Sequence, residues 1–172
     1  MHGDRDFDPA RQEPEASKFR ALFDYWRSRR NGEGLVLRAS VDPVDIPHLL
    51  ANVFLVDVVR DAVTRYRFRL VGTRICNLEG NITGTFLDEL DRDKKHLAML
   101  RHYDDACAGQ LYIRDADLGW MGKEFRRYRV MLLPLHGPAG AVDSLIGLAD
   151  YAAEPDAAAD GRSGAAYVPV AY

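Results

Sequence analysis

The sequence lacks the features that mark several large classes of protein. It has two cysteines, Cys76 and Cys107, whose spacing fits neither a CxxC motif nor a disulfide framework. No apolar run approaches the roughly 18 residues of a membrane-spanning helix, and the opening MHGDRDFDP has no apolar region typical of a signal peptide. Lysine is scarce, with 4 against 19 arginines, and the formal net charge of −3 differs from the basic excess of nucleic-acid-binding proteins. These absences predict a cytoplasmic protein with no membrane span and no nucleic-acid partner.

Catalytic signatures are missing as well. The patterns GxSxG, GxxxxGK[ST], HExxH and GxGxxG do not occur. Two carboxylate clusters, Asp88-Glu89 and Asp91-Arg92-Asp93, stand without a histidine or another metal ligand at a useful spacing, so we interpret them as charges at helix starts. We therefore expect no enzymatic activity, no catalytic residues and no metal site.

The chain has enough apolar material for one domain. Its 172 residues are 47% apolar and include 8 Tyr, 7 Phe and 2 Trp, which suffices for one hydrophobic core. Composition divides the chain into a polar arm over residues 1–13, a helix over 14–31, a domain over 32–151 with its core at 53–151, and a low-complexity tail over 152–172.

An aromatic stripe marks the first helix. Phe19, Leu22, Phe23 and Trp26 recur at the i, i+3, i+4 and i+7 positions of a single helix face. Apolar side chains in such a stripe are normally buried against another surface. The stripe either packs on its own domain or forms a seam with a second copy or another partner, and the pattern leaves both alternatives open.

Strand patterns dominate the rest of the chain. Residues 53–59 are β-branched and apolar, and 65–71 alternate with period 2, which predicts a hairpin in which Asp57 opposes Arg67 or Arg69. Asp42 and Pro43 predict a capped helix of about two turns. The remaining predictions are a helix over 93–108 and strands near 110–115, 124–135 and 142–151. This order predicts an α+β fold, a five-stranded antiparallel sheet with short helices on one face.

Several of these segments resemble the PAS domain. The matching stretches are Tyr25-Trp26, RASVDPVDIPHLLANVFLVDV (38–58), YRFRLVGTRICNLEGNITGTFLDEL (66–90) and LLPL (132–135). The most specific of them is RLVGT followed by a GxxxG at Gly80 and Gly84, which is similar to a subfamily of short stand-alone PAS proteins found mainly in alphaproteobacteria. The resemblance covers about residues 17–151.

The resemblance implies a sensory or regulatory module of bacterial signal transduction. In PAS domains the concave sheet face and the short helices enclose a cavity, while the outer face and the N-terminal helix meet partners. The function we expect is therefore protein–protein interaction in a signalling pathway, with a homodimer formed through the stripe on 14–31. The alternative is a sensor that binds a small molecule in the cavity. Candidate cavity residues are those that would point inward from two strands, Tyr66, Phe68, Leu70, Tyr128, Val130 and Leu132.

The residues argue against two cofactors that some PAS domains bind. RICNLEGN looks superficially like the photoactive motif of light-oxygen-voltage domains. In those domains the reactive cysteine follows the glycine that corresponds to Gly84, and here that stretch is Thr85-Phe86-Leu87, without a cysteine. Cys76 is then a core residue. Haem-binding PAS domains often use a histidine from the connecting helix, but His96 and His102 have charged neighbours and are expected at the surface. We expect no cofactor.

The turn after the second strand is the densest part of the match. We predict that Gly72 provides a backbone geometry closed to other residues and that Thr73 caps the following helical segment. Arg69 is predicted to point away from the cavity and to pair with a carboxylate or with helix carbonyls. These residues are expected to maintain the fold and not to bind a ligand.

Overall fold

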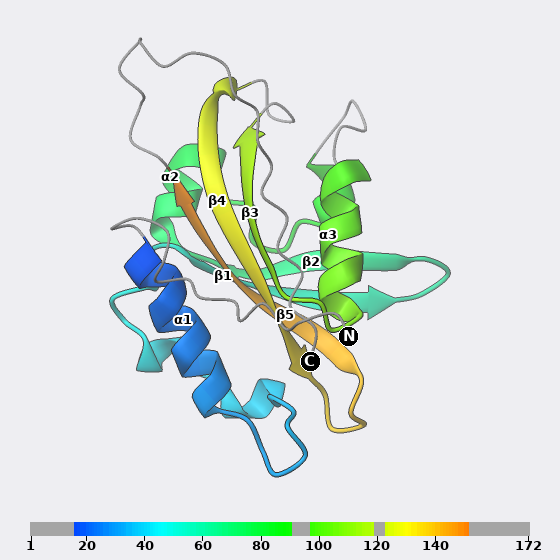
Figure 1. Ribbon diagram of the computed structural model, residues 1–172. Helices are drawn as coiled ribbons and strands as arrows, with labels where there is room; N and C mark the ends of the chain where they lie inside the picture. Colours follow the sequence, from blue (N-terminus) through cyan, green and yellow to red (C-terminus); the bar gives the residue numbers. More distant parts are fainter. Residues whose placement is uncertain (1–15, 91–96, 119–122, 152–172) are drawn as a thin grey trace, which may run out of the picture.

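A computed structural model describes residues 16–90, 97–118 and 123–151 (Figure 1). The described elements are, in chain order, α1 (Ala16–Ser28), the 3-10 turns η2 (Arg38–Ser40) and η3 (Pro43–Asp45), β1 (Val53–Arg60), β2 (Thr64–Val71), α2 (Thr73–Glu79), η4 (Leu87–Glu89), α3 (Leu97–Cys107), β3 (Tyr112–Leu118), β4 (Lys123–His136) and β5 (Val142–Tyr151). The mixed α+β class is confirmed. The predicted arm over 1–13 and tail over 152–172 lie outside the described residues.

The strands form one antiparallel sheet in the order β2-β1-β5-β4-β3. In the β1–β2 hairpin Asp57 lies opposite Arg67, and its carboxylate is 3.0 Å from the Arg67 guanidinium and 3.8 Å from that of Arg69. The predicted pairing of Asp57 is confirmed, and it helps to set the register because a slip of one residue would move these charges to the opposite face.

Helices cover both faces of this sheet, with α1 and α3 on opposite sides (Figure 1). The face that packs against α2, η4 and α3 is called the inner face, and the face that packs against α1 is called the outer face. Apolar residues alternate between the two along β1, where Phe54 and Val56 point inward and Val53 and Leu55 outward. The short helices were predicted on one face only. That prediction is incomplete, because Val41, Ile46 and Leu49, from the η2–η3 region and the turn after it, belong to the outer cluster.

The helix α1 is held on the outer face by its aromatic stripe and by a charged contact at its start. Trp26 is 1% exposed, and its indole Nε1 donates a hydrogen bond to the Pro134 carbonyl of β4 (2.9 Å). Near the start of the helix, Lys18 Nζ lies 3.1 Å from Asp150 Oδ1 on β5, and that buried carboxylate also accepts from Asn52 Nδ2 (3.1 Å). Because a buried carboxylate is costly without partners, this contact sets where α1 sits on the sheet.

The predicted cap at Asp42 is confirmed, but the helix that it starts is shorter than predicted. The Asp42 side chain accepts from Val44 N (3.0 Å), and Pro43 takes the first helical position. The helical segment is the three-residue turn η3 and not two turns. The predicted helix over 93–108 is described as α3 from Leu97, and its first residues lie outside the description.

The reason for glycine at position 72 differs from the prediction. Gly72 has φ −64° and ψ 153°, a geometry open to any residue, so the predicted special backbone is wrong. A Cβ there would instead lie 2.3 Å from the Leu50 carbonyl oxygen and 2.4 Å from that of Ala51. Thr73 is the first residue of α2 and makes no side-chain cap, while the Arg74 amide donates to the Ala51 carbonyl (2.9 Å). Close backbone approach is therefore what requires glycine.

Candidate functional site

A cavity of about 50 Å³ lies between the inner face of the sheet and the helices α2 and α3. Its walls are mostly apolar and come from both the sheet and the helical layer. The lining residues are Phe54, Phe68, Ile75, Glu79, Ile82, Leu87, Met99, His102, Tyr103, Val130, Leu132, Ala149 and Tyr151. Because protein interiors rarely leave voids larger than a water molecule, this space is a candidate binding site.

A β-bulge on β2 decides which of its residues face the cavity. Leu55 pairs with Leu70 and the next residue, Val56, pairs with Phe68, so Arg69 is an extra residue in the ladder. The bulge reverses the alternation after Phe68. Phe68 remains on the inner face, and Leu70 packs against the outer cluster. Arg69 is an exposed side chain whose guanidinium faces Asp57, as predicted.

Small residues on β5 keep the space open. Gly147 is paired with Phe54, and a Cβ on Gly147 would lie 2.2 Å from the Phe54 ring. The ring therefore lies over the glycine. The next inward position is Ala149, which lines the cavity. Larger side chains at these two positions would fill the space that Phe54 and the cavity occupy.

Polar groups enter the cavity from three elements. Glu79 is the last residue of α2, Tyr151 is the last of β5, and the Tyr151 hydroxyl donates a hydrogen bond to Glu79 Oε1. His102 and Tyr103 line the cavity from α3. An apolar cavity with a few polar groups is the usual composition of a small-molecule site, where the polar groups orient the ligand.

A second hydrogen-bonded contact ties α3 to β2 beside the cavity. The Tyr66 hydroxyl donates to Asp104 Oδ1 (2.5 Å), and the Tyr66 and Tyr103 rings lie 5.1 Å apart between centroids. Burial and the Asp104 contact raise the pKa of the Tyr66 phenol well above its ordinary value of 10.0. Burial likewise raises the pKa of the Cys107 thiol, one turn further along α3. This contact holds α3 over the cavity.

Tyr66 is expected to make stability fall at alkaline pH. Its phenol keeps its proton in the folded state above pH 10.0, where the unfolded chain loses it, so the stabilisation is complete below about pH 10 and is lost as pH rises. Tyr66→Phe should cost about 1 kcal/mol at neutral pH by removing the hydrogen bond, and its stability should fall less steeply above pH 10. Urea unfolding at pH 8 and pH 11 measures both effects. If the native chain and the Tyr66→Phe variant lost the same free energy of unfolding between these two pH values, Tyr66 would not be the source of the alkaline loss.

The structure brings together only part of the predicted cavity set. Phe68, Val130 and Leu132 line the cavity, and Tyr66 is buried next to it in the same apolar cluster. Leu70 does not line it, because of the bulge at Arg69. Tyr128 pairs with Tyr151 in the backbone ladder, and its side chain lies outside the described part.

Sequence reasoning missed several lining residues. His102 was expected at the surface, but it is half-buried and lines the cavity; His96 lies outside the described residues. Glu79 and Tyr151 carried no motif, since their contact joins segments far apart in the chain. One usable signal was present, the alternating small residues Gly147 and Ala149 in a strand otherwise rich in large apolar side chains.

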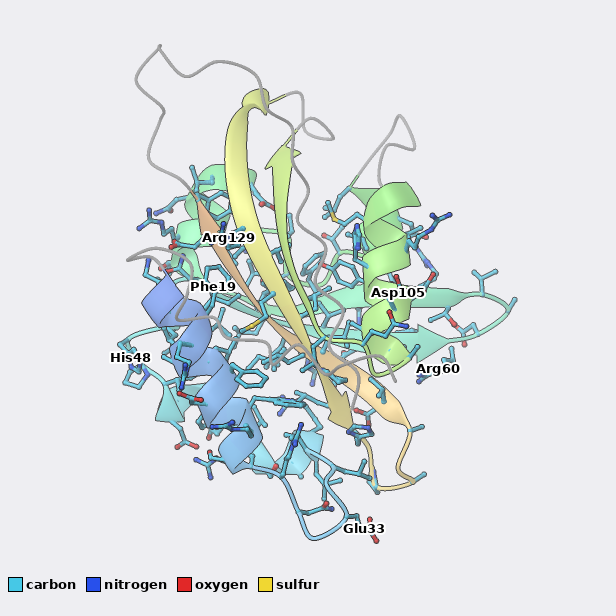
Figure 2. All side chains as sticks on the ribbon, in the orientation of Figure 1. Phe19, Glu33, His48, Arg60, Asp105 and Arg129 are labelled. Atoms are coloured by element: carbon cyan, nitrogen blue, oxygen red, sulfur yellow. The ribbon has the colours of Figure 1, made fainter. Side chains whose placement is uncertain are left out.

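The stripe on α1 is mostly inside its own domain. Phe19, Leu22 and Trp26 are buried against the outer face (Figure 2 labels Phe19), and Phe23 is partly exposed and stacked on Trp26. The pattern left open whether the stripe packs on its own domain or forms a seam with a partner, and three of its four side chains pack on the domain. Phe23 is the one member of the stripe that a partner would reach.

No three or more His, Cys, Asp and Glu side chains of the described residues come together in a group suited to a metal ion. None of the described helices is long and apolar enough to cross a membrane.

The architecture is an antiparallel sheet with a helix on its outer face and, on its inner face, a cavity under short helices. The family model described as PAS domain matches residues 15–150. The chain belongs to the PAS domain family, whose members are signal-sensing or regulatory modules. No curated protein and no solved structure is found to match the chain.

Proposed function

We propose that this PAS domain is a small-molecule sensor without catalytic activity, acting in a bacterial signalling pathway. The observation that carries the proposal is the mostly apolar cavity under α2 and α3. At about 50 Å³ it exceeds the roughly 10–15 Å³ that one water molecule needs, and it suits a compound of a few heavy atoms.

The last residues of β5 connect the cavity to the outer face, so a displacement in the cavity can be transmitted to α1. Ala149 and Tyr151 line the cavity, while Asp150 between them points to the outer face and binds Lys18 of α1. Because side chains alternate along a strand, a ligand that displaces Ala149 or Tyr151 also shifts the carboxylate that anchors α1. The proposed output of the sensor is a change in how α1 is held.

Filling the cavity tests the sensor proposal. Mostly apolar compounds of a few heavy atoms, such as isobutanol, should raise the melting temperature of the native chain in proportion to the logarithm of their concentration. Ala149→Leu should abolish this shift by occupying the space, and Ala62→Leu, in the exposed β1–β2 turn, should leave it unchanged. Thermal melts and native mass spectrometry report the binding.

A native chain that binds none of these compounds would contradict the proposal. So would an Ala149→Leu variant that is folded and still shows the full shift, because binding would then take place elsewhere.

A second candidate function is protein–protein interaction through α1, with another protein or a second copy. The solvent side of α1 and the residue just after it combine aromatic rings and arginines: the Arg29 guanidinium lies 4.8 Å from the centroid of the Tyr25 ring, and that of Arg27 lies 5.7 Å from the centroid of the Phe23 ring. Tyrosine, phenylalanine and arginine are enriched in protein interfaces. This surface favours a regulatory contact and is compatible with ligand sensing in the cavity.

A further inference from the structure

The ring of Phe54 forms part of the cavity wall and rests on a glycine of the neighbouring strand. Phe54 is a buried residue of β1, and its partner in the ladder is Gly147 of β5. A Cβ at position 147 would lie 2.2 Å from Cζ of the ring and 2.6 Å from Cε1 and Cε2. These three atoms form the far end of the ring. The space that a side chain at position 147 would occupy is therefore taken by the end of the Phe54 ring.

The neighbours of this ring direct any displacement of it toward the cavity. Strand β1 lies between β2 and β5, and the Phe68 ring of β2 is 6.0 Å from the Phe54 ring between centroids. On the other side of Phe54, Gly147 is followed across the sheet by Leu132 of β4, which also lines the cavity. Packed side chains resist displacement, whereas empty space does not. A side chain at position 147 would therefore push the Phe54 ring into the cavity.

We propose that Gly147 is a specificity-determining residue of the cavity and that it acts through the ring of Phe54. Glycine lets the ring lie close to the sheet, and the position of the ring sets how long a ligand the cavity accepts. The inference rests on the proposed sensor function and adds what limits the size of the ligand. A cavity of about 50 Å³ holds only a few heavy atoms, so we expect a short-chain compound with a mostly apolar body.

A series of unbranched alcohols, from ethanol through 1-propanol and 1-butanol to 1-pentanol, measures the size limit. Each added methylene should tighten binding to the native chain by about 4-fold, the effect of burying one CH₂ group, until the alcohol exceeds the cavity. Gly147→Ala should move this limit to a shorter alcohol. Binding of the longest alcohol that the native chain accepts should weaken by about 10-fold or more, because the displaced ring overpacks the site. Binding of ethanol should change little. NMR titrations provide the dissociation constants.

Gly32→Ala is the matched control. A Cβ on Gly32 would meet nothing within 4 Å, and this residue is not part of the cavity wall. The variant should bind the whole series of alcohols like the native chain.

A double substitution tests whether Gly147 acts through the ring. Phe54→Leu removes the three ring atoms that the added Cβ would meet. This variant should accept longer alcohols than the native chain does, and adding Gly147→Ala to it should leave the new limit unchanged. If the added methyl group filled the cavity directly, it would shorten the limit by the same amount with and without the Phe54 ring, and that result would overturn the proposal.

Gly147→Ala is expected to fold, because the ring can move into the cavity. If it does not fold, Phe54→Leu alone still measures the limit, and a limit equal to that of the native chain would overturn the proposal.

The outcomes separate the size assignment from the sensor function. If the native chain binds the alcohols and a folded Gly147→Ala variant has the same size limit, only the assignment of Gly147 fails. A native chain that binds none of the alcohols at any concentration tested would overturn the sensor function and the size assignment together.

Discussion

Trp26→Ala is expected to lower the free energy of unfolding by about 3–5 kcal/mol, the largest loss of any substitution considered for this chain. The indole is 1% exposed, lies between α1 and the outer face, and donates to the Pro134 carbonyl (2.9 Å). Alanine would leave a cavity there and remove the donor from a buried carbonyl. Urea unfolding at neutral pH measures the change.

Phe23→Ala is the matched control on the same helix. Its ring is partly exposed and stacks on Trp26 at 5.9 Å between centroids, so its loss should cost only about 1 kcal/mol. Equal losses for the two variants would show that α1 does not pack on the sheet as described. Sedimentation of the Phe23 variant also tests the partner surface, since a dimer formed through α1 should dissociate more readily without this ring.

Gly72→Ala is expected to destabilise the protein by about 1–3 kcal/mol, although the backbone at this position allows any residue. The added Cβ would lie 2.3–2.5 Å from carbonyl atoms of Leu50 and Ala51. These are backbone atoms, so relief requires separating the turn before β1 from the start of α2. That separation would also strain the hydrogen bond from the Arg74 amide to the Ala51 carbonyl. Thermal and urea unfolding report the loss.

Gly32→Ala provides the control for Gly72. A Cβ on Gly32 would meet nothing within 4 Å, and no positive φ is involved. Replacing a glycine in open space restricts the unfolded chain and should be neutral or stabilising by up to about 1 kcal/mol. A Gly72 variant as stable as the Gly32 variant would disprove the close-approach explanation.

Much of the fold was predictable because its signals are local. Strict alternation in RYRFR and the β-branched run VFLVDVV predict neighbouring strands, and the charges of Asp57 and Arg67 agree with the register of the hairpin. Asp42 before Pro43 predicts the cap that is present. Each of these patterns depends on residues within a few positions of one another, or directly across a short hairpin.

The sequence by itself determined the antiparallel strands, the cap at Asp42 and the amphipathic first helix, because backbone preference and side-chain alternation are set over a few neighbouring residues. Only the tertiary structure decided that Leu70 leaves the cavity, through a bulge whose position depends on how β1 and β2 both pack. It also decided that Gly72 is needed for close approach and that Glu79 meets Tyr151, which lies 72 positions away along the chain. Contacts between distant segments follow from how layers fit together, and a local pattern carries no record of them.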